Sequence, residues 1–266
     1  MGRIDDIFAE LRASRRAALM PFVTAGRPSL DTLPDMLLAL QDAGASIVEI
    51  GFPFSDPIAD GPVIAASMHE ALQHDVHPKD IFDQVASVRD RLTIGLVAMV
   101  SISIVYRFGL EQFCDRAAKA GFDGLIIPDV PVDEFAPLHH AINESGLTAS
   151  LLIAPTTPDD RAQRIASHCS GFVYILARTG ITGEQADAPD VRARVESLQQ
   201  VTDLPLACGF GISTAEHVRA VSEHADAVIV GSALVRRIEE AHTNGDDAVS
   251  IARSFVSELA TGLRGS

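Results

Sequence analysis

The chain has 266 residues, of which 47% are hydrophobic and 21% charged, and its mean hydropathy is +0.19, as in compact globular proteins. It carries 21 Lys and Arg against 36 Asp and Glu, so its formal net charge is −15. No basic run exceeds two residues, which argues against a nucleic-acid partner and leaves the acidic excess as a solvated, repelling surface.

The amino terminus predicts a helix, not a signal peptide. Residues 1–10 already contain four charged side chains, whereas a signal peptide needs an uninterrupted apolar segment. Further along, no apolar run approaches the roughly 20 residues that span a membrane. We therefore expect a cytoplasmic protein with no membrane partner and an amphipathic first helix.

Short apolar runs and longer segments of helical periodicity then alternate along the chain. The runs are apolar throughout, which is typical of parallel strands buried on both faces. The predicted strands are residues 18–24, 46–50, 93–100, 124–127, 148–153, 172–176, 204–207 and 227–230. Apolar stripes such as Leu33, Leu37 and Leu40 predict the helices between them, and Gly44 marks the end of that first one.

Eight such strand–helix units in about 250 residues predict a single (β/α)8 TIM barrel over residues 1–266, with the extra first helix closing its bottom. A doubly wound open sheet is the main competitor. Its dinucleotide-binding version is disfavoured, because no G-x-G-x-x-G follows the first strand.

Residues 49–62, with the sequence EIGFPFSDPIADGP, are the strongest chemical signal. Glu49 lies near the end of the second strand among buried residue types, with no basic residue nearby in sequence. If unpaired, its carboxyl should have a pKa raised by desolvation, which suits proton transfer. The alternative is a strand-end acid paired with a Lys or Arg. Asp56 and Asp60 follow in the loop, where both also fit turn residues, and spacing alone does not rank them.

Glycines at the ends of the late strands indicate a phosphate site. Gly209 and Gly211 follow the seventh strand, and Gly231 follows the eighth, each directly before a helix. Barrels often bind phosphate at these two loops, because glycine lets backbone N–H groups approach an anion at a helix start. Ordinary strand-to-helix turns are the alternative.

Two further features stay open on the residues alone. Tyr174 on the sixth strand either closes a core hydrogen bond or faces the site. Residues 182–189 are either a mobile lid over the barrel mouth or a long connector. The nine histidines show no H-x-x-x-H spacing and the three cysteines no ligand spacing, so no metal is expected.

At this point the chain resembles the tryptophan synthase α-subunit family almost from end to end. The resemblance rests on residues 49–62 and on the segments PFVTAG (21–26), PDVP (128–131), RTGITG (178–183), GFGI (209–212) and GS (231–232). It implies a lyase of tryptophan biosynthesis, which cleaves indole-3-glycerol phosphate to indole and glyceraldehyde 3-phosphate by a retro-aldol reaction. Carried over by position, Glu49 would be the general acid/base and Asp60 would hold the indole N–H.

The same resemblance assigns the binding residues. Phe22, Met99 and Ile153 would line the indole pocket, and Tyr174 would lie beside the glycerol. Thr182 would close the lid and orient Asp60. The phosphate would lie on backbone N–H groups of Gly183, Phe210, Gly211, Gly231 and Ser232.

The resemblance also implies a partner, a β subunit that uses pyridoxal phosphate and receives the indole in an α2β2 assembly, whereas this chain needs no cofactor. Two departures bear on that contact: Arg27 stands where an acid is usual, and residues 99–107 lack the usual aromatic-Asn-Pro run. Two other functions remain open at this stage. They are another phosphate-binding barrel enzyme of amino-acid biosynthesis and a catalytically weak activating subunit.

Overall fold

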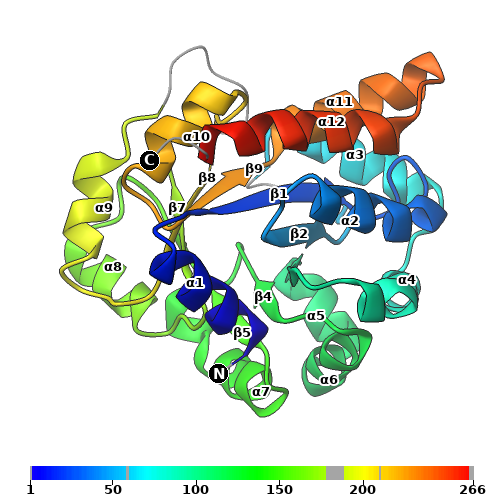
Figure 1. Ribbon diagram of the computed structural model, residues 1–266. Coiled ribbons are helices and arrows are strands. Elements are labelled where there is room, and N and C mark those ends of the chain that lie inside the picture. The colour runs from blue at the N-terminus through cyan, green and yellow to red at the C-terminus, as the bar shows by residue number, and fades with distance from the viewer. Residues whose placement is uncertain (1, 58–59, 178–188, 210, 264–266) are drawn as a thin grey trace.

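A barrel of parallel strands forms the centre of the computed structural model, which describes residues 2–57, 60–177, 189–209 and 211–263 (Figure 1). Its strands are β1 (Ala18–Thr24), β2 (Ile47–Gly51), β3 (Gly95–Met99), β4 (Gly124–Ile126), β5 (Thr148–Ser150), β6 (Leu152–Ile153), β7 (Val173–Leu176), β8 (Leu206–Gly209) and β9 (Ala227–Val230). All neighbouring strands are parallel, in the order β5-β4-β3-β2-β1-β9-β8-β7-β6.

The two outer strands in this order are successive parts of one extended segment, which is interrupted only at Leu151. The first part pairs with β4 and the second with β7. In addition, the Leu151 carbonyl accepts a hydrogen bond from the Tyr174 N–H at 3.2 Å. The segment therefore closes the ring as the fifth of eight barrel strands. This confirms the predicted TIM barrel.

Helices surround the barrel, and Figure 1 shows α11 and α12 side by side on one flank of it. The α-helices are α1 (Arg3–Ala13), α2 (Leu33–Asp42), α3 (Pro62–Gln73), α4 (Pro78–Val88), α5 (Ile102–Phe108), α6 (Leu110–Ala120), α7 (Ala136–Glu144), α8 (Asp159–Ala166), α9 (Arg192–Leu198), α10 (Ala215–Ser222), α11 (Ser232–Asn244) and α12 (Ala248–Ala260). Short 3-10 turns cover Leu30–Thr32, Arg89–Arg91, Val132–Glu134 and Thr261–Leu263.

Side chains of each strand alternate between two apolar clusters, as a strand buried on both faces requires. In β2, Val48 and Ile50 belong to the large cluster under the surrounding helices. Ile47 instead belongs to a smaller cluster inside the barrel, together with Val97 of β3. This alternation directs the side chain of Glu49 to the barrel interior, where its neighbours in register are Phe22 and Val97.

Helix α1 closes the amino-terminal end of the barrel, as predicted. Ile4, Phe8 and Leu11 of α1 pack into the inner cluster. The Phe8 ring lies 6.0 Å from the ring of Phe172, centroid to centroid. A side chain on Gly95 would lie 2.6 Å from the Cδ1 atom of Ile4. The apolar face of α1 therefore fills the floor of the barrel.

Two equivalent aspartates attach α1 to opposite sides of that floor. Asp123 directly precedes β4, and its carboxylate accepts the Leu96 N–H at 2.8 Å and faces Arg3 at 3.5 Å. Asp226 directly precedes β9, and its carboxylate accepts the Leu206 N–H at 2.9 Å and the Nε–H of Arg12 at 2.9 Å. Each aspartate thus joins a strand start to one end of α1.

The prediction of a strand at 204–207 was wrong by two residues. Pro205 has no N–H to donate, and its carbonyl accepts the Val173 N–H at 2.9 Å. The paired strand begins at Leu206 and continues through Gly209, whose carbonyl accepts the Ala177 N–H. Gly209 is consequently the end of the strand instead of part of the loop.

Within the described residues, no helix is both long enough and apolar enough to span a bilayer.

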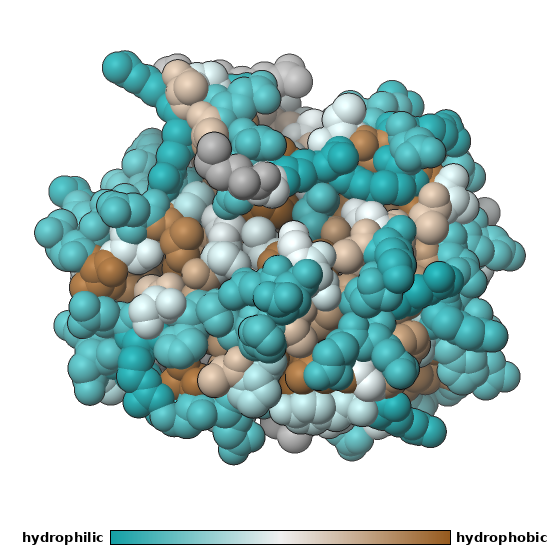
Figure 2. All heavy atoms as spheres, turned by 90° about the horizontal axis from the view of Figure 1, so that it is seen from below, coloured by the Kyte–Doolittle hydropathy of each residue, from teal (hydrophilic) through white to brown (hydrophobic). Residues whose placement is uncertain are grey.

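Figure 2 shows one face of the molecule, on which apolar side chains form separate groups within a mainly hydrophilic surface.

Candidate active site

Glu49 is the most unusual side chain of the barrel interior. It is fully buried on β2, and neither of its carboxyl oxygens has a hydrogen-bond partner within the described part of the chain. Burial raises the pKa of this carboxyl well above its ordinary value, because the ionised form is poorly solvated there. The described residues thus favour the unpaired acid over the alternative of a salt bridge. The raised pKa favours the protonated carboxyl, which suits a proton donor.

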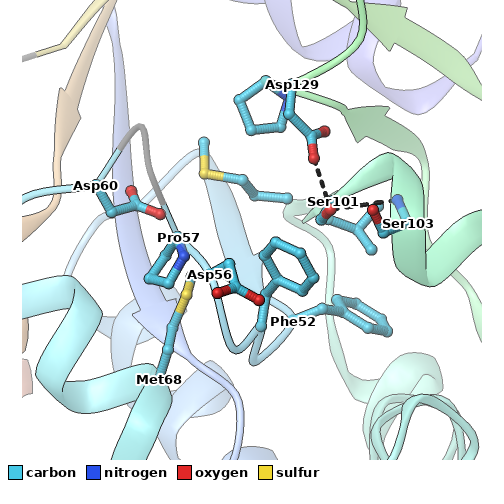
Figure 3. Close-up of a pocket in the computed structure, with 12 residues that line it drawn as sticks. Phe52, Asp56, Pro57, Asp60, Met68, Ser101, Ser103 and Asp129 are labelled. Atoms are coloured by element: carbon cyan, nitrogen blue, oxygen red, sulfur yellow. Dashed lines mark hydrogen bonds between the residues drawn. The ribbon is translucent and has the colours of Figure 1, made fainter.

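The second predicted acid, Asp60, lies at the rim of a cavity of about 420 Å3 at the barrel mouth (Figure 3). Asp60 is half-buried, its N–H donates to the Pro57 carbonyl at 3.0 Å, and desolvation raises its pKa to about 6. Asp56 lines the same cavity but is exposed, and its carboxylate accepts the Ser55 hydroxyl at 2.6 Å. Burial therefore distinguishes Asp60 from Asp56, which their spacing in the sequence could not do.

Three of the predicted binding residues lie around these acids. Met99 lines the cavity, and it also packs against a small apolar group that contains Phe22. Tyr174 is 7% exposed, and its pKa is raised by burial and further by the negative charges of Glu49 and Asp60. Because these charges act on the phenol, the three ionisable groups share one electrostatic environment.

Glycines make room for the two aromatic rings of this region. A Cβ atom on Gly51 would lie 2.4 Å from the Cζ atom of Phe22, and one on Gly209 would lie 2.8 Å from the hydroxyl of Tyr174. Contacts below 3.0 Å do not occur between real atoms of this kind, so the rings occupy the space that side chains at these positions would fill. Gly51 and Gly209 thereby shape the barrel mouth.

Ile153 is placed differently from Phe22 and Met99. It is fully buried in the outer cluster, under the surrounding helices. Its neighbour Leu152 packs against the inner cluster and pairs in register with Tyr174. The structure therefore brings Leu152, and not Ile153, to the interior side of the barrel wall. The alternation of the strand decides this, because Ala149, Leu151 and Ile153 all belong to the outer cluster.

The predicted phosphate residues are described only in part. Gly211 has φ of 77°, a left-handed conformation that glycine adopts readily, and it follows β8. Gly231 directly precedes α11, and its carbonyl accepts the N–H groups of Leu234 and Val235. Ser232 is the first residue of that helix and is buried. Gly211, Gly231 and Ser232 thus follow neighbouring strands at the barrel mouth.

Thr182, Gly183 and Phe210 lie outside the described residues, and so do all but the last of residues 182–189. Their predicted roles in the lid and in phosphate binding stay predictions.

One acid of the cavity wall had no role assigned from sequence. Asp129 follows β4, and its carboxylate accepts the Ser101 hydroxyl at 2.5 Å and the Ile102 N–H at 2.9 Å (Figure 3). These bonds hold the first turn of α5 against the loop after β4. Polar residues at the carboxyl ends of barrel strands face the mouth of the barrel. The position of Asp129 after β4 could therefore have identified it from sequence as a residue of the site.

This arrangement can perform acid–base chemistry on a substrate that reaches into the barrel. It combines a proton donor of raised pKa, a carboxylate that ionises near pH 6, and an apolar wall beside them. Among the described residues, no three His, Cys, Asp or Glu side chains are grouped as a metal site would need.

Comparisons with known proteins identify the family of this chain. A family model described as tryptophan synthase alpha chain matches residues 8–264. The tryptophan synthase alpha chain of Prochlorococcus marinus subsp. pastoris is 40% identical over 261 residues, covering 97% of this chain and 93% of the relative. That of Roseiflexus castenholzii is 42% identical over 261 residues, covering 97% and 99%.

Solved structures of tryptophan synthases are also similar to this chain. Tryptophan synthase subunit alpha from Legionella pneumophila superposes with a TM-score of 0.92 at 32% identity, covering 99% of both chains. A chain of Mycobacterium tuberculosis tryptophan synthase superposes with a TM-score of 0.90 at 32% identity, covering 100% of this chain and 99% of that one. The chain therefore belongs to the tryptophan synthase alpha chain family.

Proposed function

We propose that this barrel cleaves indole-3-glycerol phosphate to indole and glyceraldehyde 3-phosphate, as a carbon–carbon lyase of tryptophan biosynthesis. The observation that carries the proposal is the carboxyl of Glu49, which is fully buried and unpaired within the described residues, in a chain of this family.

Glu49 would begin the reaction by donating its proton to the indole carbon that bears the glycerol side chain. That carbon is weakly basic, so a desolvated and positioned acid is needed. Protonation makes the ring cationic. Asp60, ionised above a pH of about 6, would accept a hydrogen bond from the ring N–H and stabilise this charge.

Bond cleavage would follow from the protonated ring. The hydroxyl on the adjacent side-chain carbon loses its proton to the Glu49 carboxylate and becomes an aldehyde. The electron pair of the breaking carbon–carbon bond returns to the ring, which leaves as indole. Glu49 is then protonated again, so the cycle is balanced without another reactant.

Different residues at the barrel mouth would bind the indole, the glycerol and the phosphate of the substrate. Phe22 and Met99 support an indole site next to Asp60, with Leu152 replacing Ile153 as the contribution of the fifth barrel strand. Tyr174 would lie beside the glycerol. The phosphate would lie on backbone N–H groups of Gly211, Gly231 and Ser232, because helix starts attract anions. The family resemblance also supports phosphate binding by the backbone N–H groups of Gly183 and Phe210, and orientation of Asp60 by Thr182.

The family resemblance further supports a cytoplasmic α2β2 complex. The partner would be a tryptophan synthase β subunit, whose pyridoxal phosphate converts the released indole, while this chain would need no cofactor.

Indole release from indole-3-glycerol phosphate, measured with and without a cognate β subunit, tests the proposal. Release by the chain alone, or release that the β subunit accelerates, supports it. No release under either condition would leave a scaffolding role or a different phosphate-bearing substrate.

A further inference from the structure

A buried ion pair lies outside the catalytic groups, on the side of the barrel where β1 ends. The Nε–H of Arg27 lies 2.8 and 3.1 Å from the two carboxylate oxygens of Glu239, and the Nη2 group donates to the same carboxylate. The Ser67 hydroxyl donates to Glu239 at 2.9 Å. The Arg27 side chain is 7% exposed and that of Glu239 is 24% exposed, so solvent screens the pair weakly.

These three residues belong to three separate elements. Arg27 lies in the loop after β1, Ser67 on α3 and Glu239 on α11. Helix α3 starts two residues after Asp60, and α11 starts at Ser232. The hydrogen bond from Ser67 to Glu239 therefore joins α3, which follows Asp60, to α11, which starts at the proposed phosphate seat. The ion pair joins α11 to the loop after β1.

The same interface has an apolar part. Phe22, Ile64, Met68 and Val235 form one cluster between β1, α3 and α11. Met68 also lines the cavity at the barrel mouth, and it directly follows Ser67 on α3. A displacement of α3 would thus move a wall of the cavity together with Asp60, two residues before the helix.

Apolar contacts bury area but do not fix direction, so they allow helices to slide. A guanidinium that donates two bonds to one carboxylate fixes both distance and orientation. The hydroxyl of Ser67 extends this directional contact to α3.

We propose that Arg27, Ser67 and Glu239 form a positioning cluster that fixes the distance between the Asp60 loop and the phosphate seat at the start of α11. The inference rests on the proposed function. Its consequence is specific: a substrate that spans both ends of the site needs the cluster, whereas a free phosphate ion at one end does not.

Steady-state kinetics on Arg27→Met and Ser67→Ala separates these cases, with indole-3-glycerol phosphate as substrate and inorganic phosphate as competitive inhibitor. We expect kcat/KM to fall at least tenfold in Arg27→Met and a few-fold in Ser67→Ala. The inhibition constant of phosphate should stay within twofold of wild type. Arg27→Lys, which keeps the charge, should recover part of the loss.

Arg253→Met is the matched control, since Arg253 forms an exposed ion pair with Asp42 at 3.7 Å on the outer helices. It should leave both constants unchanged. Ser67→Ala keeps the test decisive if Arg27→Met does not fold, because it removes one hydrogen bond only.

The inference is overturned if the variants match an active wild type, or if the phosphate constant weakens as much as kcat/KM, which would mean a general loss of structure. An inactive wild type would instead refute the proposed function itself.

Discussion

Replacing Glu49 with Gln should change how the stability of the protein depends on pH. In the folded chain burial raises the pKa of Glu49 well above 4.5, while in the unfolded chain the carboxyl returns to about that value. Between these two pKa values the folded state holds one proton more than the unfolded state. The contribution of Glu49 to stability therefore decreases as pH rises through this window. Gln does not titrate, so the variant lacks this decrease.

The magnitude follows from proton linkage. Each pH unit above 4.5 costs about 1.4 kcal/mol of folding free energy for as long as the folded carboxyl stays protonated. Because pH 7 lies 2.5 pH units above 4.5, the upper limit of this cost at pH 7 is about 3.4 kcal/mol, a large share of the total stability of a typical domain. The buried amide of Gln adds an offset of its own, but this offset is the same at every pH.

Urea unfolding of both proteins at several pH values from 5 to 8, without substrate, measures the effect. Other groups such as Asp60 titrate equally in the two proteins and cancel from the difference. The free-energy difference should grow in favour of Gln as pH rises, by no more than about 1.4 kcal/mol per pH unit, until the pH passes the raised pKa of Glu49. A difference that stays constant with pH would show that Glu49 is ionised in the folded chain, and the proposed proton donor would be lost. The same variant should release no indole while still binding phosphate.

Further predictions concern the barrel mouth. Because the Asp60 carboxylate must be ionised to hold the ring N–H, indole formation should fall as pH drops through about 6; Asp60→Asn should be much slower and lack this limb, and an unchanged pH profile would argue against the role. Gly51→Ala should lower the free energy of unfolding by about 1–3 kcal/mol, since its Cβ would lie 2.4 Å from the Phe22 ring, and urea denaturation checks this. If stability is retained, the ring can move aside. Gly211→Asp should raise KM and the inhibition constant of phosphate by tenfold or more through charge repulsion, whereas unchanged inhibition would place the phosphate elsewhere.

Local patterns predicted the barrel well because buried parallel strands are apolar on both faces, and this shows in sequence. Sequence-based predictions failed at single residues, where a missing N–H or the direction of one side chain decides the outcome. Pro205 cannot donate an N–H, and β8 starts at Leu206. Ile153, which the family resemblance assigned to the indole pocket, shares the outer face with Leu151. Neither effect changes the composition of a strand.

The candidate site was only partly accessible from sequence. Glu49 stood out because a charge within an apolar strand is rare. The residues alone did not rank Asp60 above Asp56, since burial of a loop depends on what packs against it. The contact between Arg27 and Glu239 joins positions 212 residues apart, and no local pattern reports such a pairing.

The attachment of α1 to Asp123 and Asp226 has a consequence for biosynthesis. This helix is synthesised before every strand of the barrel, yet its anchors lie before β4 and before β9, so the second anchor follows only after eight of the nine strands. Helix α1 can therefore complete its docking only late in synthesis, and this docking connects the strand starts on opposite sides of the barrel. Deletion of residues 3–13 should consequently destabilise the whole barrel, because both contacts and the apolar floor are lost together.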